Sequence, residues 1–318
     1  MKMKTAIFAC LAAAFSANAG AQAFPTKAVT MVVPFAAGGP SDSIGRIIGP
    51  ELSARWSQPV VIENKPGGGT VVGALAVVNS VPDGHTLFSG SFANVTNEFL
   101  LAKLPYGTTA LTPVAFLGSY PLIFYTSAAS PENSVPALLE RVKKSGKPLL
   151  FGNAGNGSSA HLAAVDFGQS SGIPITSVPY KGSQGAMTDL MGGQIEAMFE
   201  GVNYKGHADS GKVRALFVGQ QQRMPQWPSL QTAAEAGLPD YISAGWYGIF
   251  APEKTPVAAQ KKIADDFFAV LSLPEVQAKL MKVGLTPEPM PQAQFAAHIE
   301  SERKRLGTLI RKHNIRLE

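Results

Sequence analysis

The sequence predicts an α/β protein with two similar lobes, because strand-like and helix-like runs alternate along it and one unit occurs twice. This unit is a strand, a glycine-rich loop and a helix, at residues 32–46 and again at 149–167. Each unit opens a strand–helix–strand run, so we expect largely parallel sheets. Two strand-like stretches, 122–126 and 246–251, are expected to cross between the lobes. A cleft then separates the lobes, with both glycine loops beside it at the carboxyl ends of strands.

Local patterns predict the elements of each lobe in turn. In the first lobe, an apolar run predicts a strand at 29–33, and Ile44, Ile48 and Leu52 give the following helix a buried face. The other elements expected there are a helix spanning 42–56, strands at 60–62 and 85–88, and a helix at 70–79. In the second lobe we expect strands at 149–151, 176–179, 197–199 and 213–218, and helices at 159–171 and 183–191. From 257 onward the chain is expected to be helical, with breaks near 273–274 and 287–291.

The N-terminus has the pattern of an export signal. Lys2 and Lys4 precede a short apolar run, and small residues follow it with a cleavage site expected after Ala23. The mature protein is therefore predicted to be periplasmic. We divide the chain into a signal peptide (1–23), a first domain formed by 24–124 and 246–318, and a second, inserted domain (125–245).

Charge and cysteine content exclude several functions. The net charge of +5 falls to +3 once Lys2 and Lys4 are removed, and the basic residues are scattered, so nucleic-acid binding is not expected. The single cysteine, Cys10, lies inside the apolar run of the signal, where a lipid anchor is not expected. The mature chain then has no cysteine, which excludes disulfides and thiolate chemistry.

The first glycine loop, PFAAGGPSD at 34–42, predicts an anion site at a helix N-terminus. Gly38 and Gly39 allow a ligand to approach the backbone closely, and Ser41 or Asp42 is positioned to cap the helix. The loop has neither the dinucleotide-binding glycine spacing nor the Gly-Lys-Ser/Thr of a phosphate loop, and it contains no cation. A carboxylate is therefore favoured over a phosphate, although a merely tight turn explains this loop equally well.

A second loop, FGNAGNGSSAH at 151–161, favours the binding interpretation. It places Asn153, Ser158 and Ser159 among three glycines, again at a helix start. Two such loops at matching places in two lobes would face one cleft from both sides. A third glycine cluster, NKPGGGT at 64–70, is interpreted as a simple loop or as a further wall of the pocket.

Signals for catalysis are weak. No G-x-S-x-G motif occurs, and the five histidines show no metal-ligand spacing. His161 follows the second loop and could contact a ligand. Glu200, at the end of a predicted strand, could face the cleft or could equally be a capping or solvated carboxylate. We expect no catalytic residue, metal or cofactor.

The chain also resembles a known family in an ordered set of stretches. These are FPTKAVTMVVPFAAGGPSD, QPVVIENKPGGGT, VPDGHTL, FGNAGNGSSAHLA, VPYKGSQGAMTDLMGGQIEAMFE, GKVRALFV and GWYGIFAPEKTP. Together they resemble the Bug or TctC-like periplasmic solute-binding proteins of tripartite tricarboxylate transporters. The resemblance covers nearly the whole mature chain.

This resemblance implies a two-domain periplasmic binding protein fold, type II-like, that closes on its ligand as a Venus flytrap with two crossing strands as hinge. It implies that the two glycine loops hold a carboxylate through backbone N–H groups and water, with Phe35 against the ligand and the segment 89–94 completing the pocket. The ligand-binding residues expected are Phe35, Ala36, Gly38, Gly39, Pro40, Ser41, Asp42, Ser91, Phe92, Asn153, Ser158, Ser159, His161 and Glu200.

The chain departs from the family pattern at three places. Ala36 and Ala37 stand where the family has two prolines, Glu200 stands where an aspartate is frequent, and the stretch 91–97 is shortened. These departures suggest a less rigid first loop and a changed ligand.

Our functional hypothesis is a monomeric binding protein that captures a small organic carboxylate, with a di- or aromatic carboxylate favoured, and presents it to the large and small membrane subunits of the transporter. No covalent step is expected. Two alternatives remain open: a ligand sensor that docks on a signalling receptor, and an exported serine hydrolase using Ser158 or Ser159 with His161.

Overall fold

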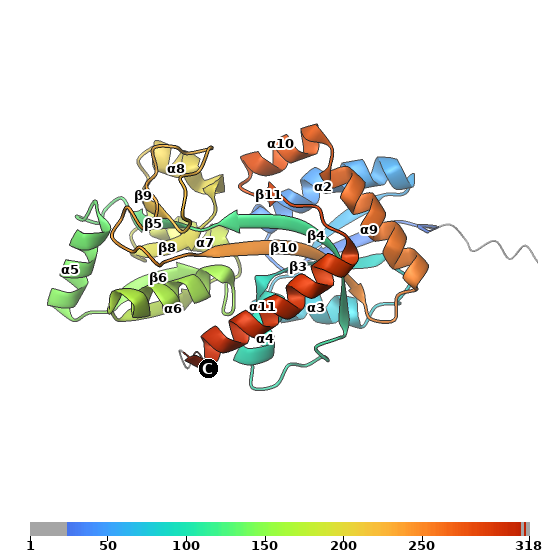
Figure 1. The fold of residues 1–318 in the computed structure, drawn as a ribbon, viewed down its shortest axis with the longest axis horizontal. Coiled ribbons are helices and arrows are strands. Elements are labelled where there is room, and N and C mark those ends of the chain that lie inside the picture. Colours follow the sequence, from blue (N-terminus) through green and yellow to red (C-terminus); the bar gives the residue numbers. More distant parts are fainter. Residues whose placement is uncertain (1–23, 313–314, 316–318) are drawn as a thin grey trace, which may run out of the picture.

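The computed structural model describes residues 24–312 and residue 315, and within them the strands form two sheets. The first sheet has the order β11 (Thr286–Pro287), β4 (Leu111–Pro121), β10 (Ala244–Pro252), β3 (Thr86–Ser91), β1 (Val29–Val33) and β2 (Val60–Asn64). The second has the order β7 (Ile175–Pro179), β6 (Leu149–Asn153), β8 (Ala197–Glu200), β5 (Ile123–Ser127) and β9 (Val213–Val218). Figure 1 shows the two sheets in two lobes side by side, bridged by the long strands β4 and β10. The expected signal peptide lies outside the described residues.

The sheets are mixed, so the expectation of largely parallel sheets is wrong. In the first sheet β1 pairs in parallel with β2 and β3, whereas β10 runs antiparallel to β3 and β4. In the second sheet β6 pairs in parallel with β7 and β8, whereas β5 runs antiparallel to β8 and β9. The chain leaves the first lobe along β4 and returns beside it along β10. A return on a neighbouring strand reverses the direction, which makes that half of the sheet antiparallel.

The chain crosses between the sheets at two adjacent points. Pro121 pairs with Ala244 at the end of the β4–β10 ladder, and the Leu122 N–H donates to the Ser243 carbonyl at 3.0 Å. The predicted crossing stretches lie just beyond these points, mainly within β5 and within β10. The domain division at residues 124 and 246 stays a prediction.

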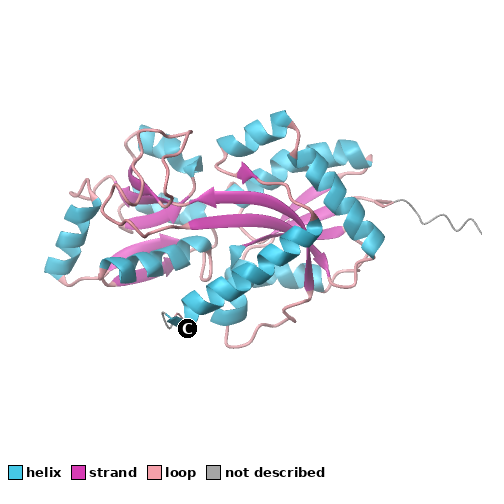
Figure 2. Cartoon of the chain, in the orientation of Figure 1, coloured by secondary structure: helices cyan, strands magenta, loops and turns pink. Residues whose placement is uncertain are grey.

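Helices cover both sheets, as Figure 2 shows. With the first sheet lie α2 (Pro40–Trp56), η1 (Gly68–Thr70), α3 (Val71–Val78), α4 (Phe92–Leu100), α9 (Val257–Leu271), α10 (Pro274–Lys282) and α11 (Gln292–Lys312). With the second lie α5 (Val135–Ser145), α6 (Ser159–Ser171), α7 (Ser183–Met191), η2 (Val202–Tyr204) and α8 (Lys205–Asp209). Within the described residues, no helix combines the length and apolar character needed to span a bilayer.

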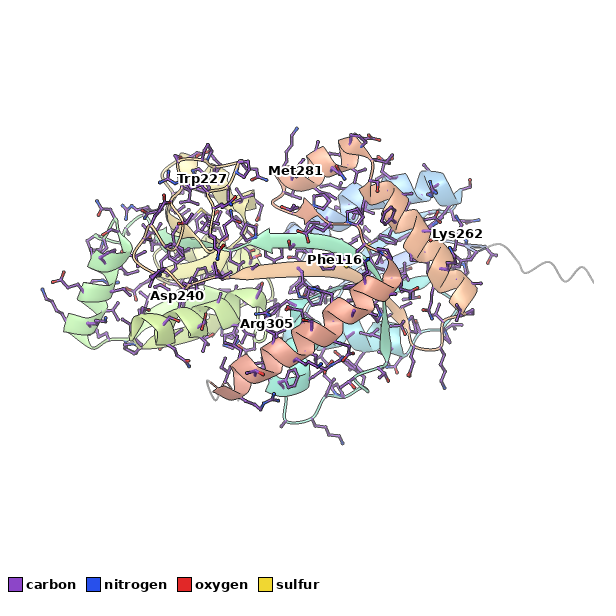
Figure 3. The ribbon with its side chains drawn as sticks, in the orientation of Figure 1. Phe116, Trp227, Asp240, Lys262, Met281 and Arg305 are labelled. Atoms are coloured by element: carbon purple, nitrogen blue, oxygen red, sulfur yellow. The ribbon has the colours of Figure 1, made fainter. Side chains whose placement is uncertain are left out.

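Each lobe has its own aromatic core. In the second lobe, Phe124 is fully buried and packs its ring against Phe167 and Phe217 at centroid distances of 4.8 and 5.2 Å. In the first lobe, Phe116 on β4 packs against Phe295 on α11, and Figure 3 places Phe116 beside that helix. Large aromatic side chains bury about 150–250 Å² each. Buried apolar packing also continues from lobe to lobe, since one cluster includes Leu117 of the first lobe, Leu122 at the crossing and Phe124 of the second.

Candidate functional site

A cavity of about 500 Å³, including space open to solvent, lies between the lobes. The first lobe contributes Phe35, Ala36, Gly39, Pro40, Ser41, Ser91, Tyr120 and Tyr247 to its wall. The second contributes Ala154, Ser158, Ser159, Ala160, Gly182, Ser183, Gln184 and Glu200. Among these described lining residues there is no lysine, arginine or histidine.

Within the part of the chain that the structure describes, four helices begin at this wall. Their N-cap residues are Gly39 for α2, Ser91 for α4, Ser158 for α6 and Gly182 for α7. The first N–H groups of a helix have no acceptor within the helix, and the helix dipole makes this end positive. These helix starts therefore direct partial positive charge at the cavity without a cationic side chain in its described lining.

The first loop turns into α2 without a side-chain cap, so the prediction that Ser41 or Asp42 caps the helix is wrong. Gly39 is the N-cap residue, and Pro40 begins the helix, where its fixed φ is favourable and its missing N–H costs nothing. Asp42 instead reaches back from the first turn, accepting from the Gly38 N–H at 3.0 Å and from Arg46 Nε at 2.9 Å. Gly38 has φ +83°, which favours glycine.

Asp42 is a structural carboxylate, and Ser41 is a free hydroxyl at the wall. Burial opposes ionisation of Asp42, but hydrogen bonds from Arg46, Gly38 and Asn64 outweigh it and lower the pKa. Ser41 is only 2 % exposed, and its Oγ has no hydrogen-bond partner among the described residues. Because a buried hydroxyl without a partner is unfavourable, Ser41 is suited to bind a ligand atom.

The second loop is held from behind by Asn153 and His161. The Asn153 Oδ1 accepts from the Gly155 N–H at 2.9 Å, and His161 Nδ1 accepts from the Gly157 N–H at 3.1 Å. His161 is 5 % exposed, and burial lowers the pKa of its imidazole to about 4, which keeps it neutral and able to accept. Ser158 Oγ caps α6 by accepting from the backbone N–H of His161 at 3.2 Å.

The start of α4 provides one wall residue. Ser91 and Asn94 form a capping box, in which Asn94 Oδ1 accepts from the Ser91 N–H at 2.9 Å. Ser91 lines the cavity, whereas Phe92 points into the first lobe's core, with the Arg305 guanidinium 5.8 Å from its ring centroid.

Two tyrosines on the connecting strands form an aromatic wall. The rings of Tyr120 and Tyr247 stack at a centroid distance of 5.1 Å, and the Tyr120 hydroxyl lies 2.9 Å from Ser159 Oγ. That hydrogen bond joins β4 to α6 across the cavity. Burial raises the pKa of both phenols, so both are neutral donors at physiological pH.

Glu200, the last residue of β8, provides the cavity's one carboxyl. Its side chain is buried, with the residue 5 % exposed, and Oε1 accepts from the Gly201 N–H at 2.9 Å. Burial raises the pKa of Glu200, and hydrogen bonds from Gly201 and Ser183 only partly offset this.

Further contacts join the loops of the two lobes directly. The Ala36 N–H donates to the Lys181 carbonyl at 3.3 Å, and Thr96 Oγ1 donates to the Gly157 carbonyl at 2.5 Å. Beside this junction lies a second, more open cavity of about 860 Å³, which shares Phe35 and Ala154 with the first. The glycine cluster 67–69 lines this second cavity.

The structure brings most of the expected ligand-binding residues to the wall, namely Phe35, Ala36, Gly39, Pro40, Ser41, Ser91, Ser158, Ser159 and Glu200. It places Gly38, Asp42, Phe92, Asn153 and His161 behind the wall. Sequence patterns missed Tyr120, Tyr247 and the turn Gly182–Ser183. That turn repeats the glycine–serine helix start of the second loop, and both tyrosines lie on the strands that join the lobes.

The hydrolase alternative receives no support from these contacts. Ser159 Oγ is bonded to the Tyr120 hydroxyl, and His161 Nδ1 is occupied by the Gly157 N–H. In residues 24–312 and 315, no group of histidine and acidic side chains is arranged to hold a metal ion.

Two lobes, two connecting strands and a cavity lined by helix N-termini define a protein that binds a solute rather than one that transforms it. The sequence matches the tripartite tricarboxylate transporter family receptor, TctC, over residues 44–315, and the chain belongs to this family of solute-binding receptors. It is not an enzyme.

Solved structures of relatives have the same fold. The protein is similar to Rpa4515 of R. palustris with adipate, at 30 % identity and a TM-score of 0.88, covering 92 % of this chain and 100 % of that one. MatC (Rpa3494) from Rhodopseudomonas palustris with bound malate is 31 % identical, with a TM-score of 0.85, and the match covers 90 % of this chain and 100 % of that one. The periplasmic binding protein BugD is 28 % identical, with a TM-score of 0.86, and the match covers 92 % of this chain and 100 % of that one.

Proposed function

We propose that this protein captures a small organic carboxylate in the periplasm and presents it to the membrane subunits of a tripartite tricarboxylate transporter. The observation that carries the proposal is the convergence of helix N-termini on a cavity without a cation in its described lining. Binding is non-covalent. The loop at Gly39–Ser41 holds one side of the carboxylate, the loop at 158–160 holds the other, and closure of the lobes excludes water.

The magnitudes support useful affinity. A helix N-terminus stabilises an anion by about 0.3–2 kcal/mol, and hydrogen bonds to a charged group contribute about 1.5–3 kcal/mol each. In the upper part of these ranges, two helix ends and three such bonds reach the roughly 8 kcal/mol that a dissociation constant of about 1 μM requires.

The cavity wall also restricts the rest of the ligand. Phe35 and the stacked pair Tyr120 and Tyr247 suit an aromatic or short aliphatic body. The adipate and malate of the two R. palustris structures support dicarboxylates as a second group of candidates. A di- or aromatic carboxylate is accordingly the favoured ligand.

Thermal-shift measurements on residues 24–318 test the proposal. Mono-, di- and aromatic carboxylates are screened beside inorganic phosphate and alkylamines. We expect at least one carboxylate to raise the melting temperature. A rise with phosphate or amines and none with any carboxylate would contradict the assignment.

Substitutions in the two loops test the binding mode. A Cβ at Gly39 would meet the Ala36 carbonyl at 3.5 Å, an ordinary contact, so Gly39→Val should fold but fill the cavity. Ser159→Ala removes the partner of Tyr120 and should lower stability by about 1 kcal/mol. We expect both to weaken binding at least about tenfold, a loss of about 1.4 kcal/mol. Gly107→Val, at a position with open space around its Cβ, is the control. Unchanged affinity in both loop variants contradicts the two-loop arrangement.

A further inference from the structure

Glu200 is a carboxyl inside a cavity that is otherwise built to bind an anion. Oε1 accepts from the Gly201 N–H at 2.9 Å, and the Ser183 hydroxyl is its other hydrogen-bond partner. A carboxylate has about four lone-pair sites, so these bonds leave acceptor capacity unused. Glu200 forms no ion pair with a described residue.

The surroundings of Glu200 do not supply the missing positive charge. The titratable groups that interact with it electrostatically are Tyr120, Tyr125, Tyr204 and Tyr247. Two of these hydroxyls donate to atoms other than Glu200. The Tyr125 hydroxyl donates to the Gly201 carbonyl at 3.0 Å, and the Tyr204 hydroxyl donates to Gln184 Oε1 at 3.5 Å. A buried carboxylate without a cation is unfavourable, so burial favours the protonated form of Glu200 in the empty cavity. A cationic or hydroxyl donor brought by a ligand would stabilise the ionised form.

Open space adjoins Glu200 on two sides. It lines the main cavity and also a smaller cavity of about 200 Å³, whose lining includes Val283 and Leu285. Of the four converging helix starts, that of α7 lies beside Glu200, because the Ser183 hydroxyl bonds this carboxyl. The start of α4 is closed by its capping box, in which the Ser91 N–H donates to Asn94 Oδ1. The starts of α2 and α6 remain for the carboxylate of the ligand.

We propose that Glu200 determines specificity by accepting a hydrogen bond from a donor group of the ligand, so that the preferred ligand is a carboxylate that also carries an ammonium or hydroxyl group. This inference rests on the proposed function and narrows its ligand class, because it selects against those dicarboxylates whose second carboxylate would lie at Glu200. An ammonium group supplies the missing charge and binds best, a hydroxyl group binds less well, and a second carboxylate at this position is repelled.

Two matched ligand series test the inference by calorimetry. Each keeps one carboxylate and changes only the far group from methyl to hydroxymethyl, aminomethyl or carboxylate. The aliphatic series is butanoate, 4-hydroxybutanoate, 4-aminobutanoate and succinate. The aromatic series is 4-methylbenzoate, 4-(hydroxymethyl)benzoate, 4-(aminomethyl)benzoate and terephthalate. In the series that fits the cavity, we expect the aminomethyl member to bind at least about tenfold tighter than the methyl member.

The variant Glu200→Gln removes the charge at nearly constant shape. It should remove most of the roughly tenfold advantage of the aminomethyl member and strengthen binding of the dicarboxylate. Glu63→Gln, on the exposed edge strand β2 where Glu63 pairs with Lys65 at 2.7 Å, makes the same charge change away from the cavity and should leave the order unchanged.

Several results would overturn the inference. If the unmodified protein binds the dicarboxylate most tightly, the inference is contradicted without any variant. Uptake of a proton on binding would add that Glu200 is protonated in the complex and acts as a neutral donor. An unchanged ligand order in Glu200→Gln contradicts it as well. Binding of phosphate or of simple amines in place of every carboxylate instead removes the proposed function itself.

Discussion

The neutral imidazole of His161 makes the second loop sensitive to acid. Its Nδ1 accepts from the Gly157 N–H at 3.1 Å, which a protonated ring cannot do. Burial lowers the pKa of His161 from its usual value of 6.5 to about 4. Below pH 6.5 the unfolded chain takes up a proton at this residue, but the folded protein does not until about pH 4. Acid therefore favours the unfolded state across this window.

The magnitude follows from the pKa difference. Each unit corresponds to about 1.4 kcal/mol, so His161 alone should lower the free energy of unfolding by about 3 kcal/mol between pH 7 and pH 4. His161→Asn offers Oδ1 as an acceptor for the Gly157 N–H without titrating in this range. Urea unfolding of the wild type and of His161→Asn at pH 7, 6, 5 and 4 gives the difference between their free energies of unfolding. The effects of the carboxylates that both proteins share cancel in this difference.

The expected result is a wild-type stability that falls relative to His161→Asn by about 3 kcal/mol as the pH is lowered to 4, with most of the change below pH 6.5. A difference that stays constant over the whole range would refute the reasoning. It would mean that the imidazole is protonated in the folded protein or is solvated at little cost.

Two further predictions concern positions with matched controls. Gly157 has φ +79°, and a Cβ there would lie 3.0 Å from polar atoms of α4. Gly157→Ala should therefore lower the free energy of unfolding by about 1–3 kcal/mol and weaken ligand binding. The control Gly146→Ala, at a position with φ +63° and open space around the Cβ, should leave binding unchanged. Equal affinities of the two variants, measured by calorimetry, would contradict this. Asp266 is buried and accepts from Trp56 Nε1 at 2.6 Å, so Asp266→Ala leaves this buried donor unpaired and should lower the free energy of unfolding by about 1–3 kcal/mol. Asp265→Ala, at an exposed residue, should change it by at most about 1 kcal/mol, and equal urea midpoints for the two would be inconsistent with this view.

The parts of the fold that depend on local patterns could be predicted from the sequence. The strands Val29–Val33 and Val213–Val218 have the bounds expected from their apolar runs, and the helix starts at 159 and 183 also agree. The family resemblance is confirmed by the match over residues 44–315. The antiparallel halves of the sheets were not predictable, because strand direction is set by where the chain returns and not by local spacing.

The site was only partly predictable for a related reason. A polar residue in a glycine loop has the same local pattern whether it contacts a ligand or holds the loop from behind, as Ser41 and Asn153 do respectively. Tyr120 and Tyr247 lie on β4 and β10, where successive side chains point to opposite faces of the sheet. The sequence does not indicate which of these faces borders the other lobe. Glu200 was noticed at a strand end, but its burial without a cation became visible only in three dimensions.

A crystal structure of residues 24–318 with the tightest-binding carboxylate of the screen tests most directly whether the carboxylate is held between two helix starts. We expect the carboxylate oxygens within hydrogen-bond distance of the backbone N–H groups of residues 39, 41 and 42 and of 159 and 160, directly or through one water, with Ser41 Oγ among the contacts. A carboxylate bound outside the cavity, paired with a surface lysine or arginine, would contradict the account.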